Sequence, residues 1–257
     1  MIKFDKKEII GMIHLAGPDA VDKAMEEIRI YEEEGLSGII VENYHGGLSD
    51  VIGVLNALKK TPTTMSVGIN ILPNEYRMAL GLAVIYNLDF IQLDHVSGVY
   101  QNGKTLDGND LSRAIIETNA NDIQIFGGIW PKYYTPKEGS VLKDDIRVGI
   151  NRCHAVVVTG GGTGIETPLY KVKLFKELIE ISRKEYADSL INLNGDVKIS
   201  EKPLIVGAGL TPLNVRETLE IAQGAIVGSA FKPNGRTHQM VDRDLVKVFM
   251  DEVRKVG

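Results

Sequence analysis

His14, Glu42 and Asp94 each end a separate short run of apolar, mostly β-branched residues. Carboxylates and imidazoles that are partly removed from water can exchange protons near neutral pH, so these three residues are predicted to act as general acid and base. Oxygen and nitrogen donors also suit Mg²⁺, Mn²⁺ or Zn²⁺, and Glu42 and Asp94 are alternatively expected to hold a divalent metal. A third interpretation is structural, with both carboxylates accepting backbone amides to brace loops.

Further polar or glycine residues follow other apolar runs and are predicted to bind a substrate: Asn43, Asn70, Thr159, Gly160 and Gly164. The last three belong to the glycine-rich segment Thr159–Gly164, which lacks the lysine of a nucleotide-binding P-loop. It is expected to form a backbone nest for an anion, the hinge of a lid, or a mobile loop.

Glycines near the carboxyl terminus point to phosphate. Glycines let backbone amides approach a ligand closely, so a phosphate site is predicted at Gly207, Gly209, Gly228 and Ser229. Lys232 or Arg236 could add positive charge there. The competing interpretation is that these glycines only form tight turns.

A lysine-dependent aldolase mechanism is not expected, because no apolar run carries an inward-facing lysine at its end. Lys132 and Lys232 both fall in predicted loops. The chain also lacks a Gly-x-Ser-x-Gly elbow and a Cys/His zinc pattern.

The elements that must position these residues alternate along the whole chain. Strands are predicted at 8–14, 38–43, 66–71, 90–94, 123–129, 155–159, 203–206 and 225–228. Helices are predicted at 20–34, 49–60, 75–86, 109–118, 141–152, 168–184, 211–222 and 242–255. The helix at 211 is expected to be capped by Thr211, and Glu185–Lys202 is the least regular stretch, expected to hold the end of the sixth helix and a connection.

Eight consecutive strand–helix units predict an α/β fold, a (β/α)₈ TIM barrel whose single domain spans residues 1–257. In such a barrel the strand ends and the loops after them build the site, and the last two units provide the usual phosphate site. An open doubly wound sheet is the alternative, but no Gly-x-Gly-x-x-Gly turn follows the first strand.

Composition narrows the class further. The chain has 257 residues and a net charge of −5, which disfavours nucleic acid as a partner. Neither a secretory signal nor a membrane span is evident, so a cytoplasmic location is expected. The single cysteine, Cys153, is predicted to be a buried structural thiol. The aromatic and proline-rich loop Trp130–Pro136 suits either the interface of a homo-oligomer or a lid over the site.

Several segments in order resemble the BtpA family, also called BtpA/SgcQ, whose members are predicted TIM barrels. They are Ile10–Leu15, Gly38–Asn43, Val67–Asn70, Val158–Gly160 with Thr163–Gly164, and Ala225–Ser229 with Phe231–Arg236. The resemblance runs from the first strand to the last helix. It implies His14, Glu42, Asn43, Asn70, Thr159, Gly160, Gly164, Gly228 and Ser229 as site residues.

The founding cyanobacterial member of that family is associated with photosystem I biogenesis, and some relatives are found beside sugar-uptake genes. This chain departs from the family after His14-Leu15, where Ala16–Asp19 replaces a proline-rich loop. Two functions are therefore expected. The first is a lyase, isomerase or hydrolase acting on a small phosphorylated metabolite such as a sugar phosphate or nucleotide. The second is a non-catalytic assembly or stability factor.

Overall fold

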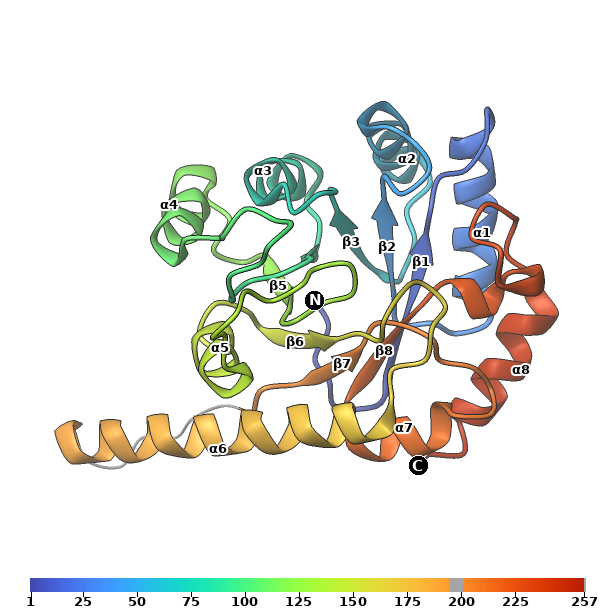
Figure 1. Ribbon diagram of the computed structural model, residues 1–257. Helices are drawn as coiled ribbons and strands as arrows, with labels where there is room; N and C mark the ends of the chain where they lie inside the picture. Colours follow the sequence, from blue (N-terminus) through green and yellow to red (C-terminus); the bar gives the residue numbers. More distant parts are fainter. Residues whose placement is uncertain (195–200, 257) are drawn as a thin grey trace.

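A computed structural model describes residues 1–194 and 201–256 of the chain, and its central feature is a closed barrel of parallel strands (Figure 1). The strands pair in sequence order, and the last pairs with the first. They are β1 (Glu8–Ile13), β2 (Gly38–Glu42), β3 (Ser66–Asn70), β4 (Phe90–Leu93), β5 (Gln124–Gly128), β6 (Ala155–Val158), β7 (Leu204–Val206) and β8 (Gly224–Val227). The predicted (β/α)₈ barrel is confirmed.

Helices follow the strands and surround the barrel (Figure 1). They are α1 (Ala20–Glu33), α2 (Leu48–Lys60), α3 (Tyr76–Tyr86), α4 (Gly108–Thr118), α5 (Leu142–Gly149), α6 (Leu169–Asn194), α7 (Val215–Ile221) and α8 (Arg243–Val253). Two short 3₁₀ turns, η1 (Ser229–Phe231) and η2 (Pro233–Gly235), lie between β8 and α8.

Two helices differ from the sequence prediction. The helix expected to end at Lys184 continues to Asn194, and Figure 1 shows α6 projecting well beyond the barrel. The rest of the irregular stretch falls partly on residues 195–200, outside the described residues. The helix expected to start at Thr211 begins at Val215, because the Thr211 hydroxyl accepts from Leu213 N and closes a preceding turn instead.

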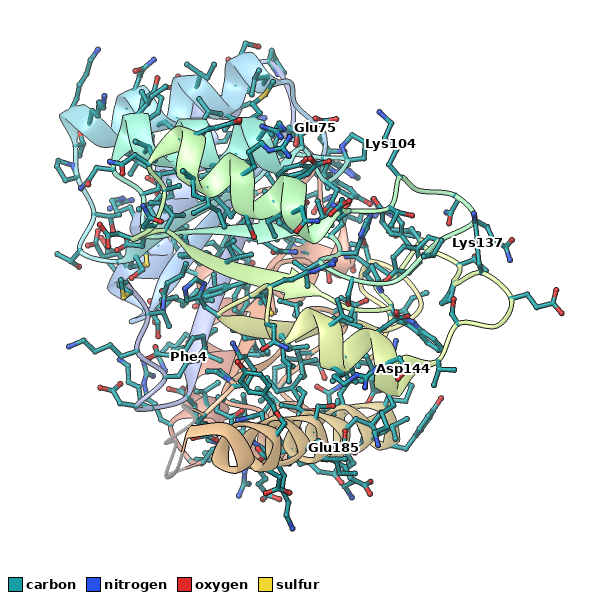
Figure 2. All side chains as sticks on the ribbon, turned by 90° about the vertical axis from the view of Figure 1, so that its left-hand side faces the viewer. Phe4, Glu75, Lys104, Lys137, Asp144 and Glu185 are labelled. Atoms are coloured by element: carbon teal, nitrogen blue, oxygen red, sulfur yellow. The ribbon has the colours of Figure 1, made fainter. Side chains whose placement is uncertain are left out.

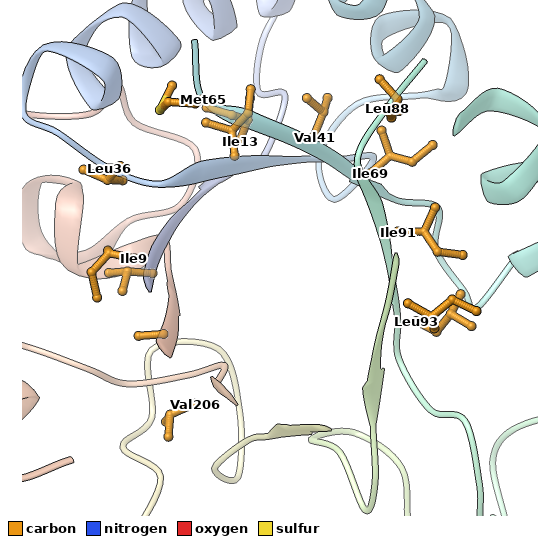
Figure 3. Packing of buried hydrophobic residues seen from close by; sticks show 14 of the residues in the cluster. Ile9, Ile13, Leu36, Val41, Met65, Ile69, Leu88, Ile91, Leu93 and Val206 are labelled. Atoms are coloured by element: carbon orange, nitrogen blue, oxygen red, sulfur yellow. The ribbon is translucent and has the colours of Figure 1, made fainter. Parts of the chain in front are cut away.

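The barrel is held by two apolar shells, because each strand is buried on both faces. Ile10, Ile40, Phe90, Phe126 and their neighbours form a cluster inside the barrel, where the two phenylalanine rings stack at 4.5 Å. The alternate residues of the same strands join the larger cluster beneath the helices. Figure 3 shows side chains of this second shell, among them Ile13 and Val41, on the outer side of the strand ring.

The amino-terminal segment covers one end of the barrel. The Ile2 backbone exchanges two hydrogen bonds of 3.0 Å with the Gln124 side chain, and Phe4 packs edge-on against Phe126. In Figure 2, Phe4 lies at the end away from the loops that carry Lys104 and Lys137. The site must therefore form at the other end, which those loops surround.

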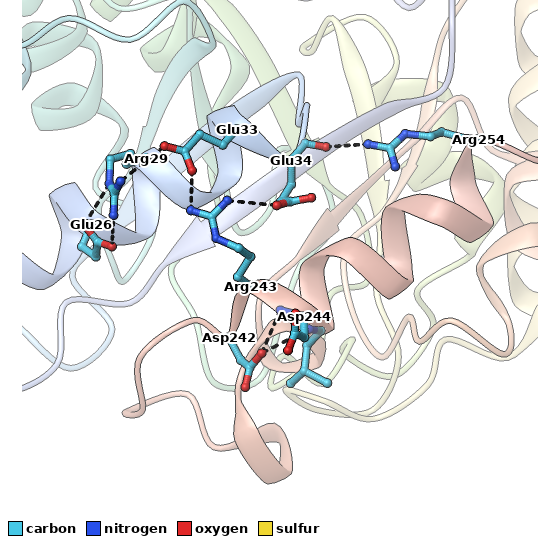
Figure 4. Close-up of polar contacts among 9 residues, drawn as sticks. Glu26, Arg29, Glu33, Glu34, Asp242, Arg243, Asp244 and Arg254 are labelled. Atoms are coloured by element: carbon cyan, nitrogen blue, oxygen red, sulfur yellow. Dashed lines mark hydrogen bonds and ion pairs between the residues drawn. The ribbon is translucent and has the colours of Figure 1, made fainter.

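Polar contacts join α1 to α8 across the closing seam (Figure 4). Arg243 pairs with Glu33 and Glu34, and Arg254 donates to the Glu34 carbonyl oxygen at 2.9 Å. The Asp242 side chain caps α8 by accepting from Asp244 N and Leu245 N. Such exposed ion pairs contribute about 0.2–1 kcal/mol each, so the apolar shells carry most of the stability.

Cys153 is buried and its thiol donates to the Gly149 carbonyl oxygen. Burial raises the pKa of this thiol to about 11, which keeps it protonated. Both observations agree with a structural role. None of the described helices is long and apolar enough to cross a membrane.

The packing of β3 against β4 gives a first testable expectation. A Cβ on Gly68 would lie 2.2 Å from Phe90 Cε2, so Gly68→Ala should destabilise the protein by about 1–3 kcal/mol. Gly81 lies within α3 with open space around it, and Gly81→Ala should add about 0.4–1 kcal/mol. Urea unfolding of both variants checks this, and equal effects of the same sign would contradict the described packing.

Candidate functional site

A cavity of about 120 Å³ opens at the carboxyl ends of the strands, enough space for several water-sized groups. Strand ends, and loops from most of the strands, contribute to it. Most of the sequence-predicted site residues line it: His14, Glu42, Asn70, Asp94, Thr159, Gly164, Gly207, Gly209, Gly228 and Ser229. The structure thus gathers these residues in one place, while their roles stay predictions.

Glu42, Asn70 and Asp94 form one polar cluster at the ends of β2, β3 and β4, in which Glu42 and Asn70 are buried and Asp94 is half-buried. The Asn70 amide donates to Glu42 Oε1 at 2.8 Å and to Asp94 Oδ1 at 3.4 Å. The Tyr134 hydroxyl donates to the second Asp94 oxygen at 2.9 Å. No backbone amide donates to either carboxylate in the recorded hydrogen bonds of the described residues. A loop-bracing role for the two acids therefore finds no support in their contacts.

Burial changes the proton affinity of both acids. Burial raises the pKa of Glu42 to about 7, opposed by the charge of Lys132 and assisted by that of Asp94. Burial also raises the pKa of Asp94, opposed by its hydrogen bonds from Tyr134 and Asn70. A carboxyl group with a pKa near 7 is present in both protonation states at neutral pH, as acid–base catalysis requires.

His14 directly follows β1, which pairs with β2 on one side and β8 on the other, and its ring lies beside Gly228 in the loop after β8. Burial is the main reason that its pKa falls well below 6.5, with the charge of Lys232 second, so the imidazole is neutral. A Cβ on Gly228 would lie 2.6 Å from His14 Cε1, so the glycine makes room for the ring. A neutral imidazole in this place can accept a hydrogen bond from a ligand at one ring nitrogen or donate one at the other.

Glycines form the wall of the cavity that comes from β6, β7 and β8. A Cβ on Gly209 would meet the Glu166 backbone at 2.3 Å, and Gly209 has a φ of +69°. A Cβ on Gly164 would lie 3.3 Å from Ser229 Oγ, so the loops after β6 and β8 are in contact. Beside the glycines, this wall also contributes apolar side chains to the lining, among them Val157, Leu210 and Ile226.

The long loop after β5 folds over the cavity and brings residues that the sequence did not assign. Pro131, Lys132, Tyr133 and Tyr134 all line it. The Lys132 amine donates to Thr163 Oγ1 at 3.0 Å, and its backbone N–H donates to Thr159 Oγ1. Lys132 lies in a loop, as predicted, and this loop reaches the cavity. These contacts agree with the lid alternative for Trp130–Pro136.

Gln92 is another lining residue that was not predicted from the sequence. It lies within β4 and lines the cavity, and its Oε1 is shielded from solvent. A glutamine inside the apolar run Phe90–Leu93 was a usable signal, because residues at alternate strand positions share one face.

Two predicted substrate-binding residues lie outside the lining. The Asn43 side chain accepts from Leu72 N at 2.7 Å and donates to the Leu72 carbonyl oxygen, so it braces the loop after β3. A Cβ on Gly160 would meet the Ile165 and Glu166 carbonyl oxygens, so this glycine permits the local fold of its loop.

The suggested extra charge for a phosphate does not come from Lys232 or Arg236, neither of which lines the cavity. Lys232 is buried and pairs with Glu27 on α1 at 2.7 Å. Arg236 is exposed. Lys132 is instead the cation that lines the cavity.

Glu42 and Asp94 were also predicted as ligands of a divalent metal, and the groups around them bear on that prediction. Across residues 1–194 and 201–256, no three His, Cys, Asp or Glu side chains gather into a metal site, so a Mg²⁺ ion would have only Glu42 and Asp94 as acidic ligands. Asn70 also directs its amide N–H₂, a donor, at both carboxylates. The amide therefore occupies one oxygen of each carboxyl, and a cation would have to use the others.

Comparison with solved structures places the fold among TIM-barrel enzymes. Tryptophan synthase from Mycobacterium tuberculosis superposes with a TM-score of 0.65 over 98% of this chain and 94% of that chain, at 12% identity. Phosphoribosyl anthranilate isomerase from Thermococcus kodakaraensis gives a TM-score of 0.59 over 96% and 99%, at 15% identity. At such identities the likeness establishes the fold alone.

Sequence comparison identifies relatives that cover nearly the whole chain. An uncharacterised protein of Methanocaldococcus jannaschii is 26% identical, covering 98% of this chain and 97% of its own length. The photosystem I biogenesis protein BtpA of Synechocystis is 22% identical, with coverages of 95% and 86%. The family profile described as "BtpA family" matches residues 5–255. The chain belongs to the BtpA family.

Proposed function

We propose that the protein is an enzyme, a lyase, isomerase or hydrolase, acting on a small phosphorylated metabolite such as a sugar phosphate or nucleotide. One observation carries the proposal: one cavity is lined by glycines that follow β6, β7 and β8 and by two carboxyls, the buried Glu42 at the end of β2 and the half-buried Asp94 after β4. In a closed barrel these strands lie across from one another. A ligand held at the glycines would reach the carboxyls with its other end.

The glycine wall is the proposed phosphate side. The loops after β7 and β8 contribute Gly207, Gly209, Gly228 and Ser229 to the lining. The Gly207 N–H already donates to the Val158 carbonyl oxygen at 2.8 Å. The other main-chain amides of these loops and the Ser229 hydroxyl are suitable donors for a phosphate, and this is the usual phosphate position in the architecture. The name of the similar phosphoribosyl anthranilate isomerase also refers to a phosphorylated compound, which supports the same substrate class.

The carboxyl side is the proposed reacting side. Glu42, with its pKa of about 7, would take up or release a proton at the substrate. Asp94, bridged to Glu42 by the Asn70 amide, would raise the proton affinity of Glu42 through its charge, and Lys132 would stabilise negative charge that develops on a substrate oxygen. His14, predicted as a proton shuttle, lies between this group and the phosphate loop.

An assembly or stability role is the second candidate, favoured by the name of the Synechocystis relative. In that case the cavity would bind no metabolite. Thermal stabilisation by phosphorylated metabolites separates the two candidates, since a ligand at 100 times its Kd adds about 2.7 kcal/mol. Repeating the screen with Mg²⁺ tests the metal alternative for Glu42 and Asp94.

The phosphate side is tested by adding negative charge to it. Ser229→Asp should repel a phosphate and reduce its affinity at least tenfold, and Gly228→Val should abolish binding by filling the loop beside His14. Gly161→Asp is the matched control, because Gly161 belongs to the neighbouring loop, has open space around it and does not line the cavity.

Binding of inorganic phosphate to the three variants is measured by calorimetry. Retained affinity in folded Ser229→Asp protein, or an equal loss in Gly161→Asp, would remove the proposed phosphate site.

A further inference from the structure

Buried polar atoms without a hydrogen-bond partner gather at the cavity. Within the described residues, five side chains have such an atom, and three of these residues line the cavity: His14, with Nδ1 unpartnered, Asn70, with Oδ1, and Gln92, with Oε1. His14 is 4% and Asn70 1% exposed. Because an unpaired buried polar group costs free energy, a cluster of them in one cavity indicates a ligand that satisfies them.

These atoms have a shared chemical character. The free oxygens of Asn70 and Gln92 are acceptors only, and the oxygens of Glu42 beside them are acceptors when ionised. The neutral imidazole of His14 can match either kind of partner.

The donors nearby are already engaged. The Tyr134 hydroxyl donates to Asp94, the Lys132 amine donates to Thr163, and the Asn70 amide donates to both carboxyls. Lys132 keeps further N–H donors, since an ammonium has three, but a second acidic group of a ligand on this side would be repelled by Glu42 and Asp94 when they are ionised.

We infer that the ligand is a phosphate ester rich in hydroxyl groups, with the hydroxyls facing Asn70, Gln92 and the two carboxyls. Hydroxyl groups donate to acceptors of this kind and carry no charge that the acids would repel. A phosphorylated carboxylic acid would instead place a second negative charge beside Glu42 and Asp94. The inference rests on the proposed function, since it takes the phosphate to lie at the glycine wall.

Calorimetry with matched probes tests the hydroxyl requirement. Ribose 5-phosphate should bind at least tenfold more tightly than propyl phosphate, which lacks hydroxyls, while phosphoglycolate should bind no better than inorganic phosphate. Adenosine monophosphate, measured in parallel, distinguishes a nucleotide from a free sugar phosphate: whichever of the two hydroxylated ligands binds more tightly names the source. Equal affinities for propyl phosphate and both hydroxylated ligands, or tight binding of phosphoglycolate, would overturn the inference.

Variants of Gln92 test whether this residue causes the preference for hydroxylated ligands. Gln92→Leu should reduce the preference for ribose 5-phosphate over propyl phosphate at least threefold and leave the affinity for propyl phosphate unchanged; Gln92→Met is the second variant if leucine does not fit. Ser182→Ala is the matched control, since Ser182 Oγ is also buried and unpartnered but lies in α6, outside the lining. An unchanged preference in both Gln92 variants would contradict the placement.

Failure of the inference is distinguishable from failure of the proposed function. If inorganic phosphate binds and Ser229→Asp weakens it, the phosphate site stands even when no hydroxyl preference is found. If no phosphate compound binds, both are wrong.

Discussion

Replacement of Glu42 by glutamine is expected to remove activity and, at the same time, to stabilise the ligand-free protein above pH 7. The first effect follows from its proposed role, because loss of a general acid or base costs about 10²–10⁴-fold in rate. The second follows from burial. Glutamine keeps the hydrogen bond from Asn70, which reaches Glu42 Oε1 at 2.8 Å, and carries no charge.

The sign of the pH dependence follows from the raised pKa. Below pH 4.5 the carboxyl is protonated in both the folded and the unfolded chain, and Glu42→Gln should change stability little. Between pH 4.5 and 7 the unfolded chain releases this proton while the buried Glu42 retains it, so the wild type loses about 3 kcal/mol that the variant keeps. Above pH 7 both states are ionised and the difference levels off. The gap in melting temperature should therefore open between pH 4.5 and 8.

Asp94→Asn should behave in the same direction, because burial also raises the pKa of Asp94. Melting temperatures across this pH range are measured first, and turnover of the most stabilising sugar phosphate is followed by NMR. A clear loss of stability at pH 8 in both variants, with ligand binding intact, would make the two acids structural.

The buried pair of Lys232 and Glu27 gives the second large effect. Their side chains are 2% and 6% exposed, and the same Glu27 oxygen also accepts from Val241 N at 3.1 Å. Burial raises the pKa of Glu27 even with the ammonium beside it. Lys232→Met would leave a buried carboxylate without its cation, and we expect a loss of about 3–5 kcal/mol.

This destabilisation should depend on pH. At low pH Glu27 takes up a proton and the missing cation matters less, so the loss should be larger at pH 8 than at pH 5. Urea unfolding at both values measures it. The double variant Glu27→Met/Lys232→Met should recover most of the stability, because replacing both partners of a buried pair is often neutral.

Lys247→Met is the matched control, since Lys247 pairs with Asp251 on the surface with 59% and 44% of the side chains exposed. Its effect should stay within about 0.5 kcal/mol. If Lys232→Met were as mild as this control, the pair would not hold the segment after β8 against α1.

The sequence predicted the barrel because its eight units each carry an apolar strand and an amphipathic helix. It also predicted the polar ring, since parallel strands in a closed barrel end at the same side. Glu42 lines the cavity while Asn43 does not, because neighbouring strand residues point to opposite faces. In the predicted strand 38–43, the alternation of side chains between the two faces would have placed Glu42 and Asn43 on opposite sides.

The rest of the site comes from loops, and the path of a loop cannot be predicted from a hydrophobic repeat. Lys132 and Tyr134 reach the cavity because their loop is tied to the loop after β4, through the bridge between Tyr100 and Pro136 and the bond from Gln101 N to Thr135 O. Lys232 was misplaced for a related reason. The 3₁₀ turn after β8 carries it away from the cavity and toward Glu27.

A crystal structure of the protein with ribose 5-phosphate tests the central claim most directly. The account predicts the phosphate against Gly207, Gly209, Gly228 and Ser229, with the sugar hydroxyls within hydrogen-bond distance of Asn70, Gln92 and Glu42. A phosphate bound elsewhere, or a sugar phosphate that does not enter this cavity at saturating concentration, would contradict it.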